Sequence, residues 1–588
     1  MRGFVIVLDC HPETGSTVLD SQLAKWEKSF SLGCLKRTDN SGCRIYLFTR
    51  DAATPAQFNQ KVYETSEGIR LWIGPRVDMT DEALLLSPLS TDFDKFFSGI
   101  SDLPSALDTA IIFCYCSPRN SLLVRTDPLN STFIYYTRTA RYLLLSNSSL
   151  TLAQLISAAV NWVAASEFLA SGSIYGNYSL YEGIRSLKPA HLYEFTQTSS
   201  REEEYWTLNA LPFNTLSARE ACQSIVEELD KDFTSLNTSG RTFVLDLTAG
   251  YDSRTNVGFA IRNLKNFQTT VSGAPGDEDV VLSLNIARHF GFKHVVTPIL
   301  SSEDPRQLDY IARAASLTDL EYDVINYSQI YNAQTQFDTL NQPSIHGSAG
   351  GDIARNIILR PEYCDPSPEG RLVVEPLIEQ RFRNLIPSGL GLSYLPIADW
   401  YSHMRGRIAE HDRPELPAFA RLDIIYLRMR MQFWQGRIGS STNRFRSSFS
   451  PWTNRRVMET MLITKWKEKR HQMLSRLFLA ALHPDLARLP VARGEAAGPM
   501  AWSTLVALPA RMRYYAGRVA WRLGWKHLHI ESKSSVFDHF GPRWEAVLGN
   551  LLRPEAVKKL KASGLLNHPL VLGRLVTLAH LEDSLKLP

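Results

Sequence analysis

The spacing of hydrophobic and polar positions changes along the chain, and residues 1–205 form the first pattern. Short apolar or alternating runs are separated there by clusters of Pro, Asp, Asn and Ser, a pattern typical of strands joined by turns. The runs cover residues 3–9, 43–50, 109–116, 121–127, 132–138 and 141–147. Two stretches, 81–98 and 151–170, have helical spacing. Many short strands with few helices predict an α+β domain of stacked sheets.

A second pattern begins near residue 215, where helical and strand-like segments alternate. Helices are expected over 218–233 and over 278–291, where Gly291 is the stop signal, and apolar strands over 241–247, 266–273 and 293–299. The alternation predicts an α/β domain with a parallel sheet, followed after about residue 370 by a helical part. The polar run at 199–206 is interpreted as the boundary between a domain over 1–205 and a domain over 206–588.

The composition is that of a globular protein with its own core. The chain has 588 residues, 44% hydrophobic and 21% charged, which excludes collagen, low-complexity disorder and a small secreted scaffold. No run of about 18 apolar residues predicts a membrane span, and the first apolar run is interpreted as a core strand rather than a signal peptide. Seven scattered cysteines without C-x-x-C or zinc spacing predict free thiols and a cytoplasmic location.

The net charge of +4 hides an uneven distribution. Residues 401–588 hold 31 Lys and Arg against 14 Asp and Glu, whereas residues 1–400 hold 33 against 46. A basic C-terminal third favours an anionic partner: a nucleotide, a polyanion, a membrane surface or the acidic N-terminal part. A solvated surface that neutralises its neighbour is the alternative. Residues 511–528 interleave basic and aromatic side chains, which leaves open a peripheral membrane contact or a packed helix with exposed arginines.

The most informative segment is FVLDLTAGYDSR, residues 243–254. An apolar strand ends at Leu247, and a turn of small and hydroxyl residues then leads into a helix. Backbone N–H groups of such a turn, with a helix N-terminus behind them, form an anion site, and Gly250 lets a phosphate approach the backbone. Asp252 supplies a hard oxygen ligand for Mg²⁺. The segment predicts a Mg²⁺–pyrophosphate site rather than a Walker A loop; a simple helix cap of Asp and Ser is the alternative.

Residues 248–253 (TAGYDS) resemble the S-G-G-x-D-S loop of the N-type ATP pyrophosphatases, in particular the asparagine synthetase and β-lactam synthetase branch. Further segments match in the family's order. VSGAP at 271–275 with Asp279 resembles its adenine-side strand, HGSAGGD at 346–352 its G-E-G-G-D-E loop, 450–459 its P-F-L-D-x-x-L-V-E segment, 482–490 its L-L-P element and 571–587 its closing helix. In the first half, 124–136 and 181–191 resemble hairpin and loop segments of the family's glutaminase domain.

This resemblance implies an Ntn-hydrolase-like domain over 1–205 and an adenine nucleotide α-hydrolase-like domain over 206–588 that binds ATP and Mg²⁺. Asp252 and Asp352 would be the catalytic carboxylates and the metal ligands. The nucleotide site would contain Leu247, Thr248, Ala249, Gly250, Tyr251, Ser253, Val271, Gly347 and Ser348. In this arrangement Thr248, Gly250 and Ser253 would hold pyrophosphate, and Leu247, Val271, Gly347 and Ser348 would surround the adenosine.

The first domain departs from the family at its nucleophile. Arg2 stands where a working glutaminase has the cysteine whose freed α-amine serves as the base. Cys10 is expected to be a buried small hydrophobe. We therefore expect no glutamine hydrolysis in residues 1–205.

The acceptor side departs as well. Ala349 and Ile353 replace the two glutamates of the G-E-G-G-D-E loop, and Ile325 and Ser328 stand where asparagine synthetases place Thr and Arg. We expect aspartate to be a poor substrate, because these side chains offer it no charge. The lysine that contacts the phosphates in the family falls at Gln472; four cations that could replace it are Lys465, Lys467, Lys469 and Arg470.

The leading hypothesis is an AMP-forming carbon–nitrogen ligase, which joins a small-molecule or peptide carboxylate to an amine or ammonia through an acyl-adenylate. The alternatives are asparagine synthesis from ammonia, lactam formation, and a non-catalytic nucleotide-binding pseudo-synthetase. The pseudo-synthetase is favoured by the replacements at Ala249, Ala349, Ile353 and Gln472. No nucleic-acid partner is expected.

Overall fold

The computed structural model describes most of the chain. The described residues are 2–11, 17–31, 34–40, 42–49, 60–65, 68–79, 108–301, 304–339, 341–347, 350–382, 397, 399–492, 497–499, 549, 552, 554–562 and 569–585. The expected helix at 81–98, the basic and aromatic segment 511–528, and Ser348 and Ala349 lie outside them.

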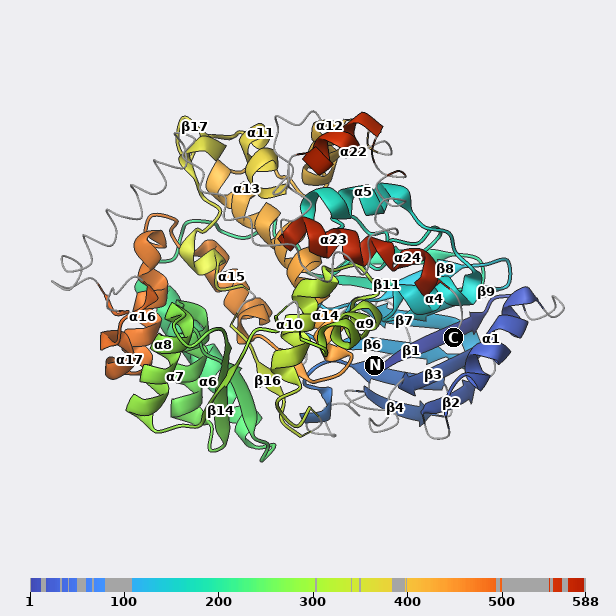
Figure 1. The fold of residues 1–588 in the computed structure, drawn as a ribbon, viewed down its shortest axis with the longest axis horizontal. Coiled ribbons are helices and arrows are strands. Elements are labelled where there is room, and N and C mark those ends of the chain that lie inside the picture. The colour runs from blue at the N-terminus through green and yellow to red at the C-terminus, as the bar shows by residue number, and fades with distance from the viewer. Residues whose placement is uncertain are drawn as a thin grey trace.

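The first part of the chain forms two six-stranded antiparallel sheets (Figure 1). In spatial order, the first sheet contains β10 (Arg185–Ser186), β8 (Tyr135–Arg138), β9 (Tyr142–Ser146), β1 (Arg2–Asp9), β3 (Cys43–Thr49) and β2 (Leu35–Asn40). The second contains β12 (Ser200–Glu204), β11 (His191–Phe195), β7 (Ser121–Arg125), β6 (Ile111–Cys116), β5 (Gly68–Ile73) and β4 (Gln60–Thr65). The predicted α+β arrangement is confirmed.

The alternation of side chains along β1 explains how the sheets stack. Phe4 and Ile6 point into a core shared with β6 of the other sheet, where the rings of Phe4 and Phe113 lie 5.4 Å apart. Val5 and Val7 point to the opposite face and join a second cluster of buried residues. Since successive residues of a strand face opposite sides, an apolar run without polar interruptions indicates a strand covered on both faces.

One prediction for this part was wrong in detail. The expected helix at 151–170 is two helices, α4 (Ser149–Ile156) and α5 (Trp162–Ser171), because Ser157 adopts a left-handed conformation and Asn161 caps the second helix. The polar run at 199–206, interpreted as the domain boundary, contains β12, which pairs with β11 at the sheet edge. The domain limits 1–205 and 206–588 stay predictions.

The predicted parallel sheet is confirmed. Its five strands are, in order, β15 (His294–Thr297), β14 (Phe267–Ser272), β13 (Phe243–Asp246), β16 (Ser344–Ile345) and β19 (Ser448–Phe449), and each neighbouring pair is parallel. Its helices include α6 (Ala218–Asn237), α7 (Tyr251–Asn263), α8 (Glu278–Phe290) and α16 (Met473–Leu482). Gly291 ends α8 in a left-handed conformation, as its sequence position predicts. Figure 1 shows α6, α7, α8 and β14 in green at the lower left, with α16 in orange beside them.

The remaining elements are mostly helical. The helices are α1 (Val18–Lys28), α9 (Gln307–Thr318), α10 (Val324–Gln334), α11 (Val374–Leu377), α12 (Trp400–Ala409), α13 (Ala418–Ile425), α14 (Gly436–Asn443), α15 (Arg455–Ile463), α17 (Pro484–Arg488), α22 (Pro554–Ala562), α23 (Pro569–Ala579) and α24 (Leu581–Ser584). The 3-10 turns are η1 (Val77–Met79), η3 (Ser117–Arg119), η4 (Ile353–Arg355), η5 (Pro361–Tyr363), η9 (Pro451–Thr453) and η10 (Arg470–Gln472); η6 (Ile378–Phe382) and η8 (Tyr426–Gln435) are π-helical, and β17 (Cys364–Asp365) pairs with β18 (Arg371–Leu372). The expected closing helix at 571–587 is therefore α23 followed by α24.

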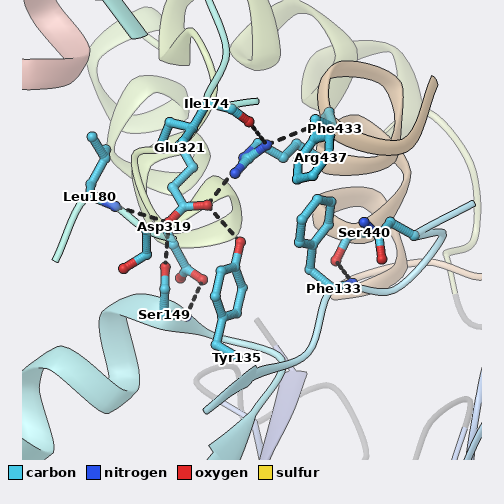
Figure 2. Close-up of polar contacts among 12 residues, drawn as sticks. Phe133, Tyr135, Ser149, Ile174, Leu180, Asp319, Glu321, Phe433, Arg437 and Ser440 are labelled. Carbon is cyan, nitrogen blue, oxygen red and sulfur yellow. Dashed lines mark hydrogen bonds and ion pairs between the residues drawn. The ribbon is translucent and has the colours of Figure 1, made fainter. Parts of the chain in front are cut away.

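A buried polar network joins the antiparallel sheets to the later helices, and Figure 2 shows it. Glu321, between α9 and α10, accepts hydrogen bonds from Tyr135 of β8 and Ser149 of α4, and it forms an ion pair with Arg437 of α14 at 3.1 Å. Nearby, Asp319 forms a second pair with Arg444. All four charged side chains are buried, so their partners are needed to offset the loss of solvation.

All seven cysteines are buried free thiols, as the sequence predicts. In the part of the chain that the structure describes, no helix is long and apolar enough to cross a membrane.

Candidate functional site

The loop between β13 and α7 has the form expected of an anion site. Gly250 is the N-cap of α7, and since it has no side chain it provides no side-chain cap for the helix. The Ser253 hydroxyl accepts a hydrogen bond from the Thr248 N–H and lies 3.0 Å from the Thr248 hydroxyl. These contacts fold the loop back on the first turn of the helix. The N-terminus of α7, where the helix dipole favours negative charge, thus opens at the carboxyl edge of the sheet.

A second loop follows β16, the strand beside β13, and packs against the first. A Cβ atom on Gly347 would lie 2.6 Å from the Ser253 nitrogen, and one on Gly351 would lie 2.3 Å from the Asp252 carboxyl carbon. Close packing therefore explains Gly347 and Gly351, two of the three glycines of the HGSAGGD segment. The Asn256 side chain also donates to the His346 carbonyl at 3.2 Å.

The contact of the loops brings the two predicted carboxylates together. Nη2 of Arg355 lies 2.7 Å from an oxygen of Asp252 and 2.5 Å from an oxygen of Asp352. The Tyr426 hydroxyl, at the start of η8, donates to the other oxygen of Asp352. Arg355 and Tyr426 are site residues that the sequence analysis missed. The only available signal was the position of Arg355, three residues after Asp352, the last residue of the HGSAGGD segment.

The electrostatics of this pair favour a cation. Burial raises the pKa of Asp252 to about 6; the Arg355 charge acts to lower it, and the Asp352 charge acts to raise it. Two carboxylates that converge in a partly buried site repel each other unless a positive charge lies between them. In this structure the guanidinium of Arg355 supplies that charge.

The residues present fit a magnesium–nucleotide complex. Mg²⁺ is held in proteins by one or two carboxylates together with substrate phosphates, so Asp252 and Asp352 are sufficient protein ligands. Among the described residues there is no group of three or more His, Cys, Asp and Glu side chains that could form an all-protein metal site. One contact opposes an added anion: the Ala249 N–H already donates to the Asp279 carboxylate at 2.8 Å.

Among the described residues of the predicted nucleotide site, Leu247 and Val271 also lie at this sheet edge, and Tyr251 does not. Leu247 follows β13 and its N–H donates to Thr270 of β14, next to Val271. The carboxyl ends of neighbouring parallel strands are where ligands bind in open α/β sheets. Tyr251 is the exception, because its side chain is buried in the core and its ring lies 5.6 Å from the Arg476 guanidinium carbon. The Tyr251 side chain therefore packs in the core next to the loop and does not face the site.

The candidate phosphate-contacting cations differ in their surroundings. Lys469 is fully buried and donates to Asp423 at 2.7 Å, so its charge is already neutralised. Lys465 and Lys467 are exposed and lie near Glu468 and Glu369. The short turn η10, which contains Arg470 and Gln472, contacts η4, the turn that follows Asp352.

The segment that resembles the L-L-P element is joined to the loop through Arg254, which follows Ser253. Its fully buried guanidinium donates to the carbonyls of Leu489 and Pro490 at 2.9 and 2.7 Å. The Ala492 N–H donates to the Ala249 carbonyl. Burial lowers the pKa of Arg254 to about 10, so it remains charged at neutral pH. Arg254 thus fixes this segment at the edge of the site.

The acceptor-side residues do not form one common wall. Ile353 is buried in the core beneath the parallel sheet, whereas Ile325 packs against the core cluster of the antiparallel sheets. The Ser328 hydroxyl donates to the Ile325 carbonyl at 2.7 Å. The expectation that the pocket offers aspartate no charged partner therefore rests on Ile325 and Ser328 alone.

Arg2 occupies the position where the family resemblance places a nucleophile. Its side chain is buried, and its backbone N–H donates to the Arg444 carbonyl at 2.8 Å. Cys10 lies at the end of β1, is 2% exposed and packs in the core between the sheets, as expected. Burial raises the pKa of its thiol.

No protein-family model matches the chain, and no curated protein matches its sequence. Solved structures similar to it include a glutamine phosphoribosylpyrophosphate amidotransferase from B. subtilis in complex with ADP and GMP, with 10% identity and a TM-score of 0.20, over 65% of this chain and 82% of that chain. Another is described as the allosteric regulatory enzyme of purine biosynthesis, also with 10% identity and a TM-score of 0.20, over 61% and 71% of the two chains. A TM-score of 0.20 does not establish a shared fold.

Proposed function

We propose that this protein is an ATP-dependent ligase, related to the asparagine and β-lactam synthetases, that forms an amide through an acyl-adenylate. The observation that carries the proposal is the convergence of Asp252 and Asp352 from two loops beside the uncapped N-terminus of α7. A carboxylate pair next to an anion-binding helix end suits a magnesium-bound pyrophosphate leaving group.

In the proposed reaction, an oxygen of the substrate carboxylate attacks the α-phosphate of ATP, and the bond from this phosphate to pyrophosphate breaks. An amine or ammonia then attacks the acyl carbon and AMP leaves. Mg²⁺, bound by Asp252 and Asp352, would neutralise the charge of the pyrophosphate. The loop around Thr248 and Ser253 would position the phosphates, so catalysis would consist mainly of positioning and charge stabilisation.

The amine would not come from glutamine hydrolysed in residues 1–205. Arg2 fills the position of the nucleophile and Cys10 is buried. We therefore propose that this part is a structural, Ntn-hydrolase-like unit and that free ammonia or an amine substrate is used.

A hydroxylamine assay tests the ligase directly. Hydroxylamine captures an acyl-adenylate as a hydroxamate, so a panel of amino acids, hydroxy acids and short peptides is incubated with ATP, Mg²⁺ and hydroxylamine. Hydroxamate and AMP should form with at least one member of the panel, and Asp252→Asn should abolish both. The matched control is Asp39→Asn, which changes an exposed carboxylate of β2 paired with Arg37. Hydroxamate formation that survives Asp252→Asn would contradict the assignment.

A second candidate is a pseudo-synthetase that binds nucleotide without turnover. Two contacts favour it: Arg355 already bridges the two carboxylates, and Asp279 already accepts from the Ala249 N–H. This candidate predicts Mg²⁺-dependent binding of ATP with no hydroxamate from any carboxylate.

A further inference from the structure

A cavity of about 420 Å³ lies outside the two loops, between the second antiparallel sheet and the helical part. Lys188, His191 and Glu204 line it from the sheet side, and His411, Arg413 and Arg428 line it from the segment after α12 and from η8. Its volume is in the range of small-molecule sites.

The charged side chains that line the cavity carry an excess of positive charge. The acidic lining residues already have cation partners: Glu204 accepts from Arg428, and Glu410 accepts from Arg407 at 2.9 Å. Arg413 differs, because among the described residues its guanidinium has no carboxylate partner and donates only to the neutral oxygens of Asn209 and of the Asp412 backbone. The lining therefore contains one guanidinium whose charge is not compensated.

Polar groups beside Arg413 also lack partners. Nε2 of His411 and Oδ1 of Asn177 are both buried and without a hydrogen-bond partner among the described residues. Their accessible surface is essentially zero, so both atoms lie behind the lining and do not face the open space of the cavity. Arg428 and Gln432 are nine-tenths or more buried and form a fixed polar wall, with Gln432 held by the Pro128 carbonyl.

The neutral state of His411 agrees with a positive field in the cavity. Burial, together with the charges of Arg428, Arg413 and Arg407, lowers the pKa of His411 to about 4. The imidazole is therefore neutral at pH 7 and can donate or accept one hydrogen bond, while the surrounding arginines attract an anion.

We infer that this cavity is a binding site for a small monocarboxylate, whose carboxylate pairs with the Arg413 guanidinium. A guanidinium matches a planar carboxylate with two parallel hydrogen bonds. A single negative charge compensates the one unpaired cation, whereas a phosphate dianion would place excess negative charge beside Glu204 and Glu410. The inference does not depend on the proposed ligase activity.

Saturation-transfer NMR on the full chain tests this inference, with benzoate and N-acetylglycine as probes, benzamide as the neutral analogue and inorganic phosphate as the competing anion. Both carboxylates should show saturation transfer and benzamide should not. Phosphate should not displace them at equal concentration. Arg413→Met should weaken benzoate binding at least tenfold, and Arg413→Lys should weaken it less, because lysine keeps the charge but not the fork.

Arg371→Met is the matched control, since Arg371 is an exposed arginine paired with Asp365; it should bind benzoate as the wild type does. Asp352→Asn should also bind benzoate normally, which separates this site from the nucleotide site. Absence of carboxylate binding, binding unaffected by Arg413→Met in a variant that melts as the wild type, or displacement of benzoate by equimolar phosphate would each overturn the inference.

Discussion

Asp252, in the first turn of α7, and Asp352, at the end of the loop that follows β16, contact the same nitrogen atom, Nη2 of Arg355. Gly347 and Gly351 make this possible, because a Cβ atom on Gly347 would collide with the Ser253 backbone and one on Gly351 with the Asp252 carboxylate. The site is thus held together by close backbone packing and by one shared cation. A magnesium–nucleotide complex that binds the two carboxylates would compete with Arg355 for them.

Arg355→Met should therefore destabilise the protein when no divalent cation is present. The free energy of unfolding in EDTA should fall by about 2 kcal/mol, because two partly buried carboxylates lose a charged hydrogen-bond donor. Added Mg²⁺ should raise the melting temperature of the variant more than that of the wild type. Arg371→Met serves as the control and should have little effect. A variant as stable in EDTA as the wild type would show that Arg355 does not hold the carboxylates together.

The buried pair of Glu321 and Arg437 should contribute far more than a surface pair. Arg437→Met leaves a fully buried carboxylate without its cation and should cost about 3–5 kcal/mol in urea unfolding. Arg201→Met, which removes an exposed pair with Glu203, should cost less than about 1 kcal/mol. The double variant Glu321→Gln/Arg437→Met should be more stable than Arg437→Met alone. Equal losses for Arg437→Met and Arg201→Met would contradict this account of the junction.

Much of the site was predictable because its signals are local. The strand, turn and helix around Gly250 follow from hydrophobic spacing and from small residues at the turn, and the HGSAGGD segment is recognisable for the same reason. Arg355 and Tyr426 were not predictable, because their role arises only when η4 and η8 meet at Asp352. The contact of Arg254 with the 489–490 carbonyls is also long-range.

The errors in the fold have the same physical origin. Nothing in the polar run at 199–206 indicates a strand, and it becomes β12 because β11 offers it an edge to pair with. The interruption of the 151–170 helix at Ser157 depends on a left-handed residue that hydrophobic spacing does not report. In contrast, β13, β14 and β15 were expected from the alternation of helical and strand-like segments, whereas the two-residue strands β16 and β19 were not.

Asp323 should make stability depend on pH. It caps α10, and burial raises the pKa of its carboxyl group to about 6, whereas hydrogen bonding to Asn326 and the charge of Arg574 act to lower it. The native state then holds its proton more tightly than the unfolded state. This group contributes roughly 3 kcal/mol to the free energy of unfolding below about pH 4, and this contribution is lost as the pH rises through 6. Relative to the wild type, Asp323→Asn should thus gain stability between pH 4 and pH 7.5 in urea titrations. A constant difference across this range would contradict the prediction.

Glutamine hydrolysis should be undetectable with or without ATP. Arg2 has no nucleophilic atom, and the Cys10 thiol is buried with a raised pKa, which keeps it protonated at neutral pH. The measurement is glutamate release, together with intact-mass analysis after treatment with the glutamine analogue 6-diazo-5-oxo-norleucine. An adduct that maps to Cys10 or to any other residue of the antiparallel sheets would show that this part of the chain has a reactive nucleophile.

The central claim, that Asp252 and Asp352 form a magnesium–pyrophosphate site, is tested most directly by calorimetric titration of pyrophosphate into the protein. With Mg²⁺ present, the wild type and the control Asp39→Asn should bind one pyrophosphate per chain. Binding should weaken at least tenfold in EDTA and in Asp352→Asn, because each change removes a bridge between the carboxylates and the phosphates. Pyrophosphate binding of equal affinity with and without Mg²⁺, unchanged in Asp352→Asn, would contradict the account.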